Sequence, residues 1–365
     1  MVAPLRNSLT LRAKIALDDA ALTMLSYAIP SPTHEQWQII DEELGAARDV
    51  AARRGWLTNP ERYHVKPPAL TRPQVRKAAY RDLEFQHVQF PSEYEPYIDE
   101  PGRERWLAYS ANRTAHAWVM RHRGQPRPWL MCIHGYAMGM PFLDLEAFPT
   151  RYLYNELGLN LIFPVLPLHG PRKLAWLSGE RFLACNWMDT IHAEAQAMWD
   201  LRRLIGWLRQ HGAPSIGVYG LSLGGYTAAL LAALERDLAC AIAGMPAVDM
   251  LRLAKLHMPP ATLAMAKQVG VTWTGVRQML QVISPLALDP LVPRSARFIF
   301  GGSDDKLVPI DHVRALWNHW ERPKAHWYEG SHLSFRWEPT IDQFIRDAVE
   351  STLCARSSGV TRQAA

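Results

Sequence analysis

A serine between closely spaced glycines is the residue of this 365-residue sequence best suited to covalent chemistry. The segment Tyr-Gly-Leu-Ser-Leu-Gly-Gly at 219–225 follows an apolar run at 216–219 and precedes another at 226–234. That order predicts a strand, a sharp turn and a helix, and the glycines two residues before and after Ser222 leave room for a strained backbone. Free N–H groups at the start of the helix would favour developing negative charge. We therefore expect Ser222 to be a nucleophile, with a chance Gly-x-Ser-x-Gly match as the alternative.

A serine hydroxyl needs a base to take its proton and a third group to orient that base. Two loops downstream of Ser222 carry titratable side chains just past predicted strands, Asp304 and Asp305 in the first loop and His332 in the second. Sites in open α/β sheets form at the carboxyl ends of strands. The pattern indicates a triad in the chain order Ser, Asp, His. Taken singly, a loop aspartate is more often a turn former and a loop histidine is more often solvated.

These segments together resemble the α/β-hydrolase superfamily, over roughly residue 85 to the C-terminus. The acid of that family commonly stands in a Gly-x-x-Asp-x-x-Val-Pro pattern, which Gly302, Asp305, Val308 and Pro309 match. The resemblance therefore implies that Asp305 is the acid, with its neighbour Asp304 as the rival.

The family base follows the last strand in a Gly-x-His setting, which Gly330 and His332 match. The resemblance implies a serine esterase or lipase-like enzyme in which Ser222 attacks a carbonyl, His332 moves the proton and Asp305 orients His332. The expected partner of such an enzyme is its substrate, a small and partly apolar acyl ester or thioester that is cleaved through an acyl-enzyme. An acyltransferase or a peptidase would use the same residues, and a non-catalytic ligand-binding protein on this fold is a further alternative. The sequence does not indicate an oligomeric state.

The tetrahedral intermediate of this reaction needs two N–H donors for its oxyanion. We expect the backbone N–H of Leu223, the residue after the nucleophile, to be one donor. The loop after the run 129–133 begins with a His-Gly pair, and the next residue gives the second donor in the family. Tyr136 is therefore expected in this role, with Ala137 as the alternative. The loop is not of the His-Gly-Gly-Gly type that marks one large lipase and esterase group, so the substrate class does not transfer.

A sheet is needed to position these residues. Strand-length apolar runs lie at 129–133, 161–165, 216–219, 238–243, 298–300 and 326–328. Helical segments lie between several of them, and the clearest places six apolar residues on one stripe: Ile191, Ala195, Met198, Leu201, Ile205 and Leu208. This alternation predicts the α/β class, an α/β-hydrolase fold with a mainly parallel sheet and helices on both faces.

The ends of the chain differ from this alternating pattern. Residues 1–80 are predicted to form a helical N-terminal extension, in which Ser31-Pro32 caps a helix over 36–52. The hydrolase domain is placed at 81–356, and a polar flexible tail at 357–365.

A long segment at 246–290 interrupts the alternation of strands and helices. It exceeds an ordinary connection between elements and carries methionines and leucines at helical spacing. We expect a helical cap or lid over the nucleophile, in which Trp273 and the methionines form an adaptable apolar ceiling. Simple packing of these residues onto the sheet is the alternative.

Charge and motifs exclude several classes. The net charge of +5 comes from 40 basic and 35 acidic residues spread along the chain, so no nucleic-acid partner is expected. Four dispersed cysteines form no CxxC pair, and His-Glu-x-x-His, dinucleotide and phosphate-loop motifs are missing from the sequence. We therefore expect no cofactor and no metal.

The sequence also predicts a cytoplasmic protein without a transmembrane segment. Asp18 and Asp19 interrupt the only apolar stretch that resembles a secretory signal. The one uncharged run long enough to span a bilayer, 211–234, contains a proline and several glycines, and fits a strand, turn and helix better.

The loop His-Gly-Pro-Arg-Lys at 169–173 follows a predicted strand. It is either a simple turn at the rim of the sheet or a site where Arg172 or Lys173 contacts an acidic part of a substrate.

Overall fold

The sheet has nine strands in the described part of the chain. The computed structural model describes residues 9–28, 30–184 and 186–354. The strands are β1 (Gln74–Tyr80), β2 (Leu83–Pro91), β3 (Thr114–Met120), β4 (Trp129–Ile133), β5 (Asn160–Pro164), β6 (Ile216–Leu221), β7 (Ala241–Gly244), β8 (Arg297–Gly302) and β9 (Lys324–Tyr328). They lie in the order β1-β2-β3-β5-β4-β6-β7-β8-β9. The pairs from β5 to β9 are parallel, whereas β1, β2 and β3 form an antiparallel edge.

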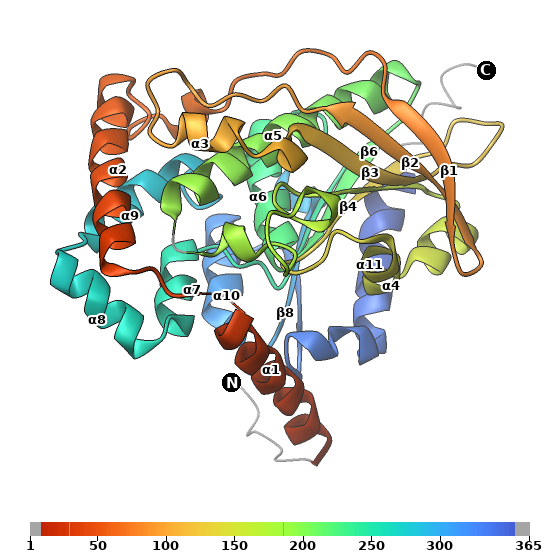
Figure 1. The fold of residues 1–365 in the computed structure, drawn as a ribbon. Helices are drawn as coiled ribbons and strands as arrows, with labels where there is room; N and C mark the ends of the chain where they lie inside the picture. Colours follow the sequence, from red (N-terminus) through yellow and green to blue (C-terminus); the bar gives the residue numbers. More distant parts are fainter. Residues whose placement is uncertain (1–8, 29, 185, 355–365) are drawn as a thin grey trace.

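Helices lie on both faces of the sheet. They are α1 (Leu9–Ala28), α2 (His34–Arg53), α3 (Arg103–Leu107), α4 (Pro141–Ala147), α5 (Trp187–Gln210), α6 (Leu223–Leu234), α7 (Met250–His257), α8 (Pro260–Val269), α9 (Trp273–Leu280), α10 (Ile310–His319) and α11 (Pro339–Val349). Figure 1 shows α6 and α10 on one side of the sheet and α4 and α11 on the other. The six stripe residues of α5 are all buried. The predicted α/β class and the mainly parallel sheet are confirmed.

The sheet begins earlier than the sequence predicts. β1 lies inside 1–80, which was expected to be wholly helical, and β2 and β3 are not among the predicted strands. Most side chains of β1 are exposed, so it has no apolar alternation to reveal it. Its backbone pairs with β2 through a tight turn in which Arg81 takes a φ of 53°.

The helix predicted over 36–52 is α2, but its cap is Thr33 and not Ser31. The Thr33 hydroxyl accepts a hydrogen bond from the Gln36 N–H, and the Gln36 side chain accepts one from the Thr33 N–H. This reciprocal capping box satisfies two N–H groups that a helix start leaves free. Ser31 lies 2.5 Å from Thr262 in α8, hydroxyl to hydroxyl, so it joins the N-terminal segment to the insertion.

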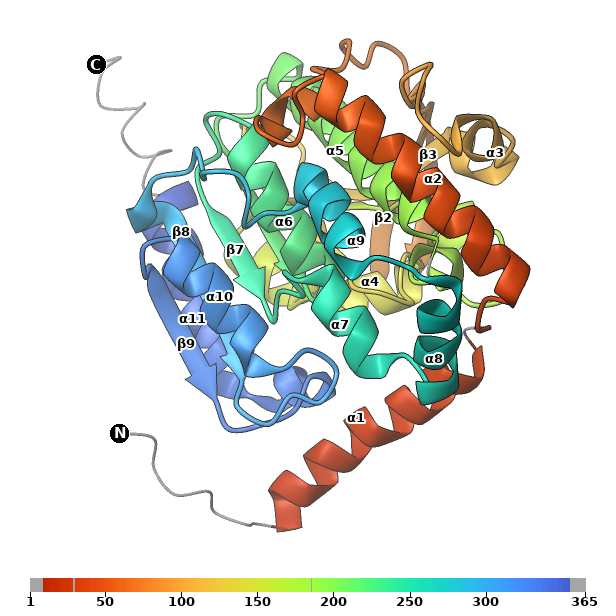
Figure 2. The ribbon, with the colours of Figure 1, turned by 90° about the vertical axis from the view of Figure 1, so that its left-hand side faces the viewer.

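The predicted insertion at 246–290 is helical and consists of α7, α8 and α9. Figure 2 shows α9 beside α2 on the face of the sheet that α6 covers. The Trp273 ring packs edge to face on Trp37 of α2, with centroids 6.3 Å apart. Trp273 therefore contributes to the packing between the insertion and the N-terminal helices, and its place in a ceiling over the nucleophile stays a prediction.

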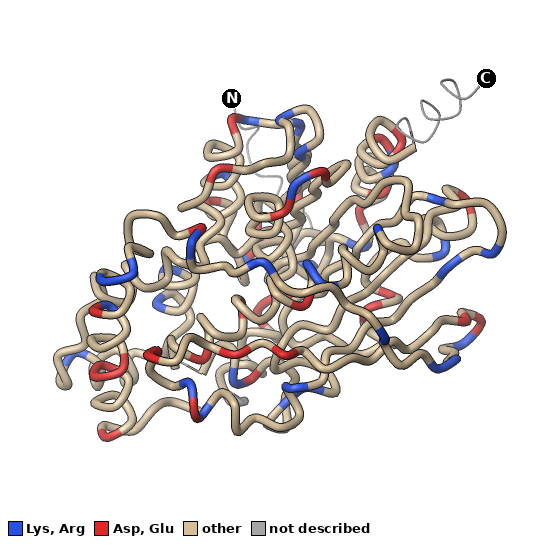
Figure 3. Tube along the Cα trace, turned by 90° about the horizontal axis from the view of Figure 1, so that it is seen from above, with Lys and Arg blue, Asp and Glu red and all other residues tan. Residues whose placement is uncertain are grey.

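Charged residues are scattered over the surface of the fold. Figure 3 shows Lys and Arg interspersed with Asp and Glu along the trace. Among the described residues, none of the helices combines the length and apolar character needed to cross a membrane. The tail predicted at 357–365 lies outside the described residues.

Candidate active site

Ser222 occupies a strained turn between β6 and α6. Its backbone has a φ of 57° and a ψ of −114°, a combination that residues other than glycine rarely adopt. The turn is so tight that only glycine fits at two positions. A Cβ on Gly220 would lie 1.9 Å from the Gly224 carbonyl oxygen, and a Cβ on Gly224 would lie 2.0 Å from the Ile133 carbonyl oxygen. Strain of this kind typically costs about 1–3 kcal/mol and persists where the surroundings enforce it. The predicted strand, turn and helix around Ser222 are present.

Asp305 and His332 face each other at the carboxyl ends of β8 and β9. Asp305 Oδ2 lies 2.6 Å from His332 Nδ1, and Asp305 Oδ1 accepts a 2.7 Å hydrogen bond from the Val308 N–H. Both side chains are buried. Burial acts to lower the pKa of His332, but the charge and hydrogen bond of Asp305 outweigh it, so the pKa is raised above 6.5. The imidazole is therefore held with Nδ1 as donor, which leaves Nε2 free to accept a proton.

The two loops reach this geometry because β8 and β9 are neighbours in the sheet. Backbone bonds continue beyond the strands, from the Ser303 N–H to the Tyr328 carbonyl and from the Asp304 N–H to the Gly330 carbonyl, at 2.9 and 3.1 Å. Asp304 Oδ2 instead accepts a hydrogen bond from the hydroxyl of its neighbour Ser303. Of the two candidate acids, the geometry favours Asp305.

Ser222 lies at the same sheet edge, two strands away from the Asp305 loop. Its N–H donates a 2.8 Å hydrogen bond to the Gly244 carbonyl at the end of β7. Within the described residues, Ser222 Oγ forms no hydrogen bond with His332 Nε2. Such links are often long in unliganded enzymes and tighten when substrate binds. The structure thus pairs Asp305 with His332 and places Ser222 on the same edge of the sheet.

The loop after β4 passes directly beside Ser222. A Cβ on Gly135 would lie 3.4 Å from Ser222 Cβ, so glycine permits the close approach. The N–H groups of Tyr136 and Leu223 find no acceptor among the residues that the structure describes, and so could face an oxyanion. The Tyr136 ring packs against His169.

Two buried residues that the sequence analysis did not single out for function hold this loop. His134 Nε2 accepts a 3.0 Å hydrogen bond from the Leu166 N–H, and His134 Nδ1 then donates to the Gly135 carbonyl at 2.7 Å. Burial lowers the pKa of His134 to about 4, which keeps it neutral in this role. Asp144 Oδ1 accepts from the Gly139 N–H at 2.9 Å. A lone aspartate inside the apolar segment of α4 was the only sequence signal for this contact.

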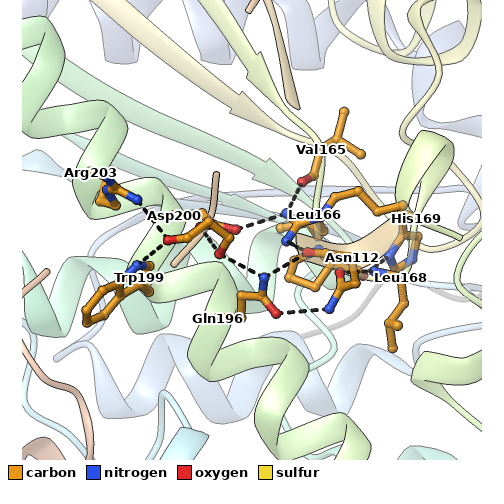
Figure 4. Close-up of polar contacts among 12 residues, drawn as sticks. Asn112, Val165, Leu166, Leu168, His169, Gln196, Trp199, Asp200 and Arg203 are labelled. Carbon is orange, nitrogen blue, oxygen red and sulfur yellow. Dashed lines mark hydrogen bonds and ion pairs between the residues drawn. The ribbon is translucent and has the colours of Figure 1, made fainter. Parts of the chain in front are cut away.

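Arg172 is a structural residue of the adjacent loop. Its side chain is fully buried, forms a 3.0 Å ion pair with Asp200 of α5 and donates to the carbonyls of Val165 and Asn112. Figure 4 shows Asp200 and Asn112 in the polar cluster beside this loop. The suggestion that Arg172 contacts substrate is therefore wrong, because its donors are directed into the protein. The exposed Lys173 binds the Trp176 carbonyl.

A pocket of about 200 Å³ lies between α6 and the insertion. Its lining is mixed: Tyr226, Val248, Asp249, Met250, Leu251, Arg277, Leu280, Gln281, Ser284, Leu286 and Ala287. Tyr226 stands one helical turn after Ser222, and its N–H bonds to the Ser222 carbonyl. No group of three or more potential metal ligands occurs among the described residues.

The amino-acid sequence is similar to those of two mycobacterial proteins. No family model matches it. It is 40% identical over 356 residues to uncharacterized proteins of two strains of Mycobacterium tuberculosis, MT2702 of CDC 1551 / Oshkosh and Rv2627c of ATCC 25618 / H37Rv, covering 95% of this chain and 84% of each relative.

Solved structures are similar at the level of fold. An acetyl xylan esterase from Paenibacillus sp. R4 matches 81% of this chain and 99% of its own, with a TM-score of 0.55 and 15% identity. Acetyl xylan esterase 1 from Thermoanaerobacterium sp. JW/SL YS485 also has a TM-score of 0.55, with 14% identity, over 81% of this chain and 92% of its own. The chain therefore belongs to the family of the two mycobacterial proteins, and its sheet and helices have the α/β-hydrolase fold.

Proposed function

We propose that the protein is a serine hydrolase that cleaves a carboxylic ester or thioester through an acyl-enzyme. The observation that carries the proposal is the pairing of Asp305 with His332, 2.6 Å apart, at the sheet edge where the strained turn presents Ser222. A positioned base and an orienting acid are what a serine hydroxyl requires to become a nucleophile at neutral pH.

In the proposed reaction Ser222 Oγ attacks the carbonyl carbon while His332 Nε2 takes the hydroxyl proton. The N–H groups of Tyr136 and Leu223 stabilise the oxyanion. His332 then protonates the leaving group, which departs and leaves the acyl group on Ser222. Water attacks the acyl-enzyme as His332 again accepts a proton, and the carboxylic acid and free Ser222 are released. The position of Ser222 at the start of α6 supports this assignment because the N-terminus of a helix favours developing negative charge.

Labelling with a fluorophosphonate probe tests the proposal. The intact protein should be labelled on Ser222 alone and should hydrolyse p-nitrophenyl esters, whereas Ser222→Ala should lose both properties while its melting temperature changes little. Loss of a triad nucleophile typically lowers kcat by about 10⁴-fold or more. Ser303→Ala is the matched control, since Ser303 is an exposed serine of the acid loop, the loop after β8 that carries Asp305. Labelling that persists in Ser222→Ala would overturn the assignment.

We also infer that the acyl group is partly apolar and lies against the insertion. The supporting observation is the pocket beside Tyr226, to which Val248, Met250 and Leu251 contribute apolar walls. A series of acetyl, butyryl, hexanoyl and octanoyl esters tests this inference. Each methylene buried should add about 0.8 kcal/mol at most, so kcat/KM should rise until the pocket is full. A steady fall beyond acetyl would refute an apolar acyl site there.

A further inference from the structure

Helix α1 carries a buried carboxylate on a mainly apolar face. Leu11, Ile15, Leu22 and Leu25 lie on the side of the helix that faces the protein, and Asp18 stands among them without solvent exposure. A charge in such a place is costly unless hydrogen bonds compensate for the lost water. The hydrogen-bond donors around Asp18 therefore indicate its role.

Asp18 accepts three backbone hydrogen bonds from the two loops of the candidate active site. Its Oδ2 accepts from the N–H of His332 at 2.8 Å and from the N–H of Lys306 at 3.0 Å. Its Oδ1 accepts from the N–H of Leu333 at 3.0 Å. The donors are the base residue itself, its successor and the successor of Asp305, so one carboxylate joins both loops.

Further contacts hold α1 against the base loop. The Ser331 hydroxyl donates to the Lys14 carbonyl at 2.7 Å, and the Lys14 ammonium forms an ion pair with Glu338 and donates to the Glu329 carbonyl. Figure 2 shows α1 at the end of the molecule toward which β7 and β9 point. The N-terminal helix therefore packs on the loops that carry the acid and the base, more than 280 residues away in sequence.

We propose that Asp18 is a positioning residue of this active site, which holds the Asp305 and His332 loops in register through their backbone N–H groups. The inference rests on the proposed hydrolase function. By fixing the backbone on both sides of the 2.6 Å contact, Asp18 keeps the imidazole aligned before substrate arrives. Its negative charge also favours the imidazolium that forms when His332 takes the serine proton.

The charges around His332 make this role measurable. Besides the effect of burial, which lowers the pKa of His332, the carboxylates of Asp305 on the acid loop and Asp18 on α1 both raise it. Tyr328 at the end of β9 donates its hydroxyl to the Ser331 carbonyl beside His332, and burial raises the Tyr328 pKa far from neutrality. Loss of the Asp18 charge should therefore move the His332 titration to lower pH.

Asparagine is a demanding test because it keeps the shape of Asp18 but not its three acceptor positions. One amide oxygen can still accept from His332 and Lys306, but the NH₂ group then meets the N–H of Leu333, donor against donor. Asp18→Asn should lower kcat/KM for p-nitrophenyl butyrate and the rate of fluorophosphonate labelling by about tenfold or more, in line with the cost of a displaced catalytic group. The control is Asp19→Asn, because Asp19 is the exposed neighbour on the same helix.

The experiment also follows the His332 imidazole by NMR, with its signal assigned by its loss in His332→Gln. In Asp18→Asn the titration should move to lower pH, and in Asp19→Asn it should not. Asp18→Glu, which keeps the charge but displaces the carboxylate by one methylene, should retain most of the titration shift and lose labelling rate. It provides the test if the asparagine variant does not fold.

The outcomes separate the two proposals. An unchanged titration together with unchanged labelling in Asp18→Asn would overturn the positioning role. If the intact protein neither hydrolyses esters nor reacts with the probe while the titration still shifts in Asp18→Asn, the hydrolase function fails and the coupling of Asp18 to His332 stands.

Discussion

Replacing Asp305 with asparagine would change one hydrogen bond of the proposed triad while preserving its shape. Asp305 Oδ1 accepts from the Val308 N–H at 2.7 Å and Oδ2 accepts from His332 Nδ1 at 2.6 Å. An asparagine that keeps its oxygen on Val308 presents an NH₂ group to His332 Nδ1, which must then be the acceptor. The imidazole proton moves to Nε2, and the base can no longer take the proton of Ser222. The opposite orientation of the amide places its NH₂ group against the Val308 N–H.

The expected loss follows from this change of tautomer. By precedent with serine triads, kcat should fall by about 10⁴-fold. That factor corresponds to about 5 kcal/mol of transition-state stabilisation. Asp304→Asn is the matched control, because Asp304 bonds to Ser303 and not to His332, and its kcat should stay within about twofold of the parent.

Steady-state hydrolysis of p-nitrophenyl butyrate at pH 8, with the fluorophosphonate labelling rate as a second readout, measures both variants. Thermal melting checks that each protein is folded. A larger loss in Asp304→Asn than in Asp305→Asn would transfer the role to Asp304. A loss of kcat below about tenfold in both variants would mean that neither residue orients the base, because the wrong imidazole tautomer lowers kcat by much more than that.

Three further predictions follow from buried charges. Because Asp305 raises the pKa of His332 above 6.5, kcat/KM should fall tenfold per pH unit below a midpoint that lies above pH 6.5, and a midpoint under pH 6.5 would contradict the pairing. The raised pKa of His332 also contributes to the free energy of unfolding. This contribution is fully present below the pKa of His332 in the unfolded chain and is lost as pH rises through its pKa in the folded protein, which urea unfolding at several pH values would detect. Arg172→Met should leave the Asp200 carboxylate without its cation and destabilise the protein by about 3–5 kcal/mol, measured by urea unfolding. An unchanged stability with a raised KM for acidic esters would instead restore Arg172 as a substrate contact.

Local patterns in the sequence were sufficient for much of the site and of the central sheet. The turn around Ser222 could be predicted because glycine spacing and a strand followed by a helix are short-range features. The apolar stripe of α5 could be recognised for the same reason, since a period near 3.6 residues reports burial on one face. Those signals also placed Asp305 and His332 after strands of one parallel sheet, so their meeting at its carboxyl edge followed from fold class.

Other contacts between distant groups were decided by the tertiary structure alone. Asp18 looked like a charge that merely interrupts an apolar stretch, and only the docking of α1 shows it accepting hydrogen bonds from Lys306 and His332. Arg172 could be assigned to the rim until its burial against Asp200 was seen. The edge strand β1 has mostly exposed side chains and is held by pairing with β2, so no local pattern marks it. In each case the stabilising partner comes from another segment of the chain, and a pattern read along one segment carries no record of the partner that folding brings beside it.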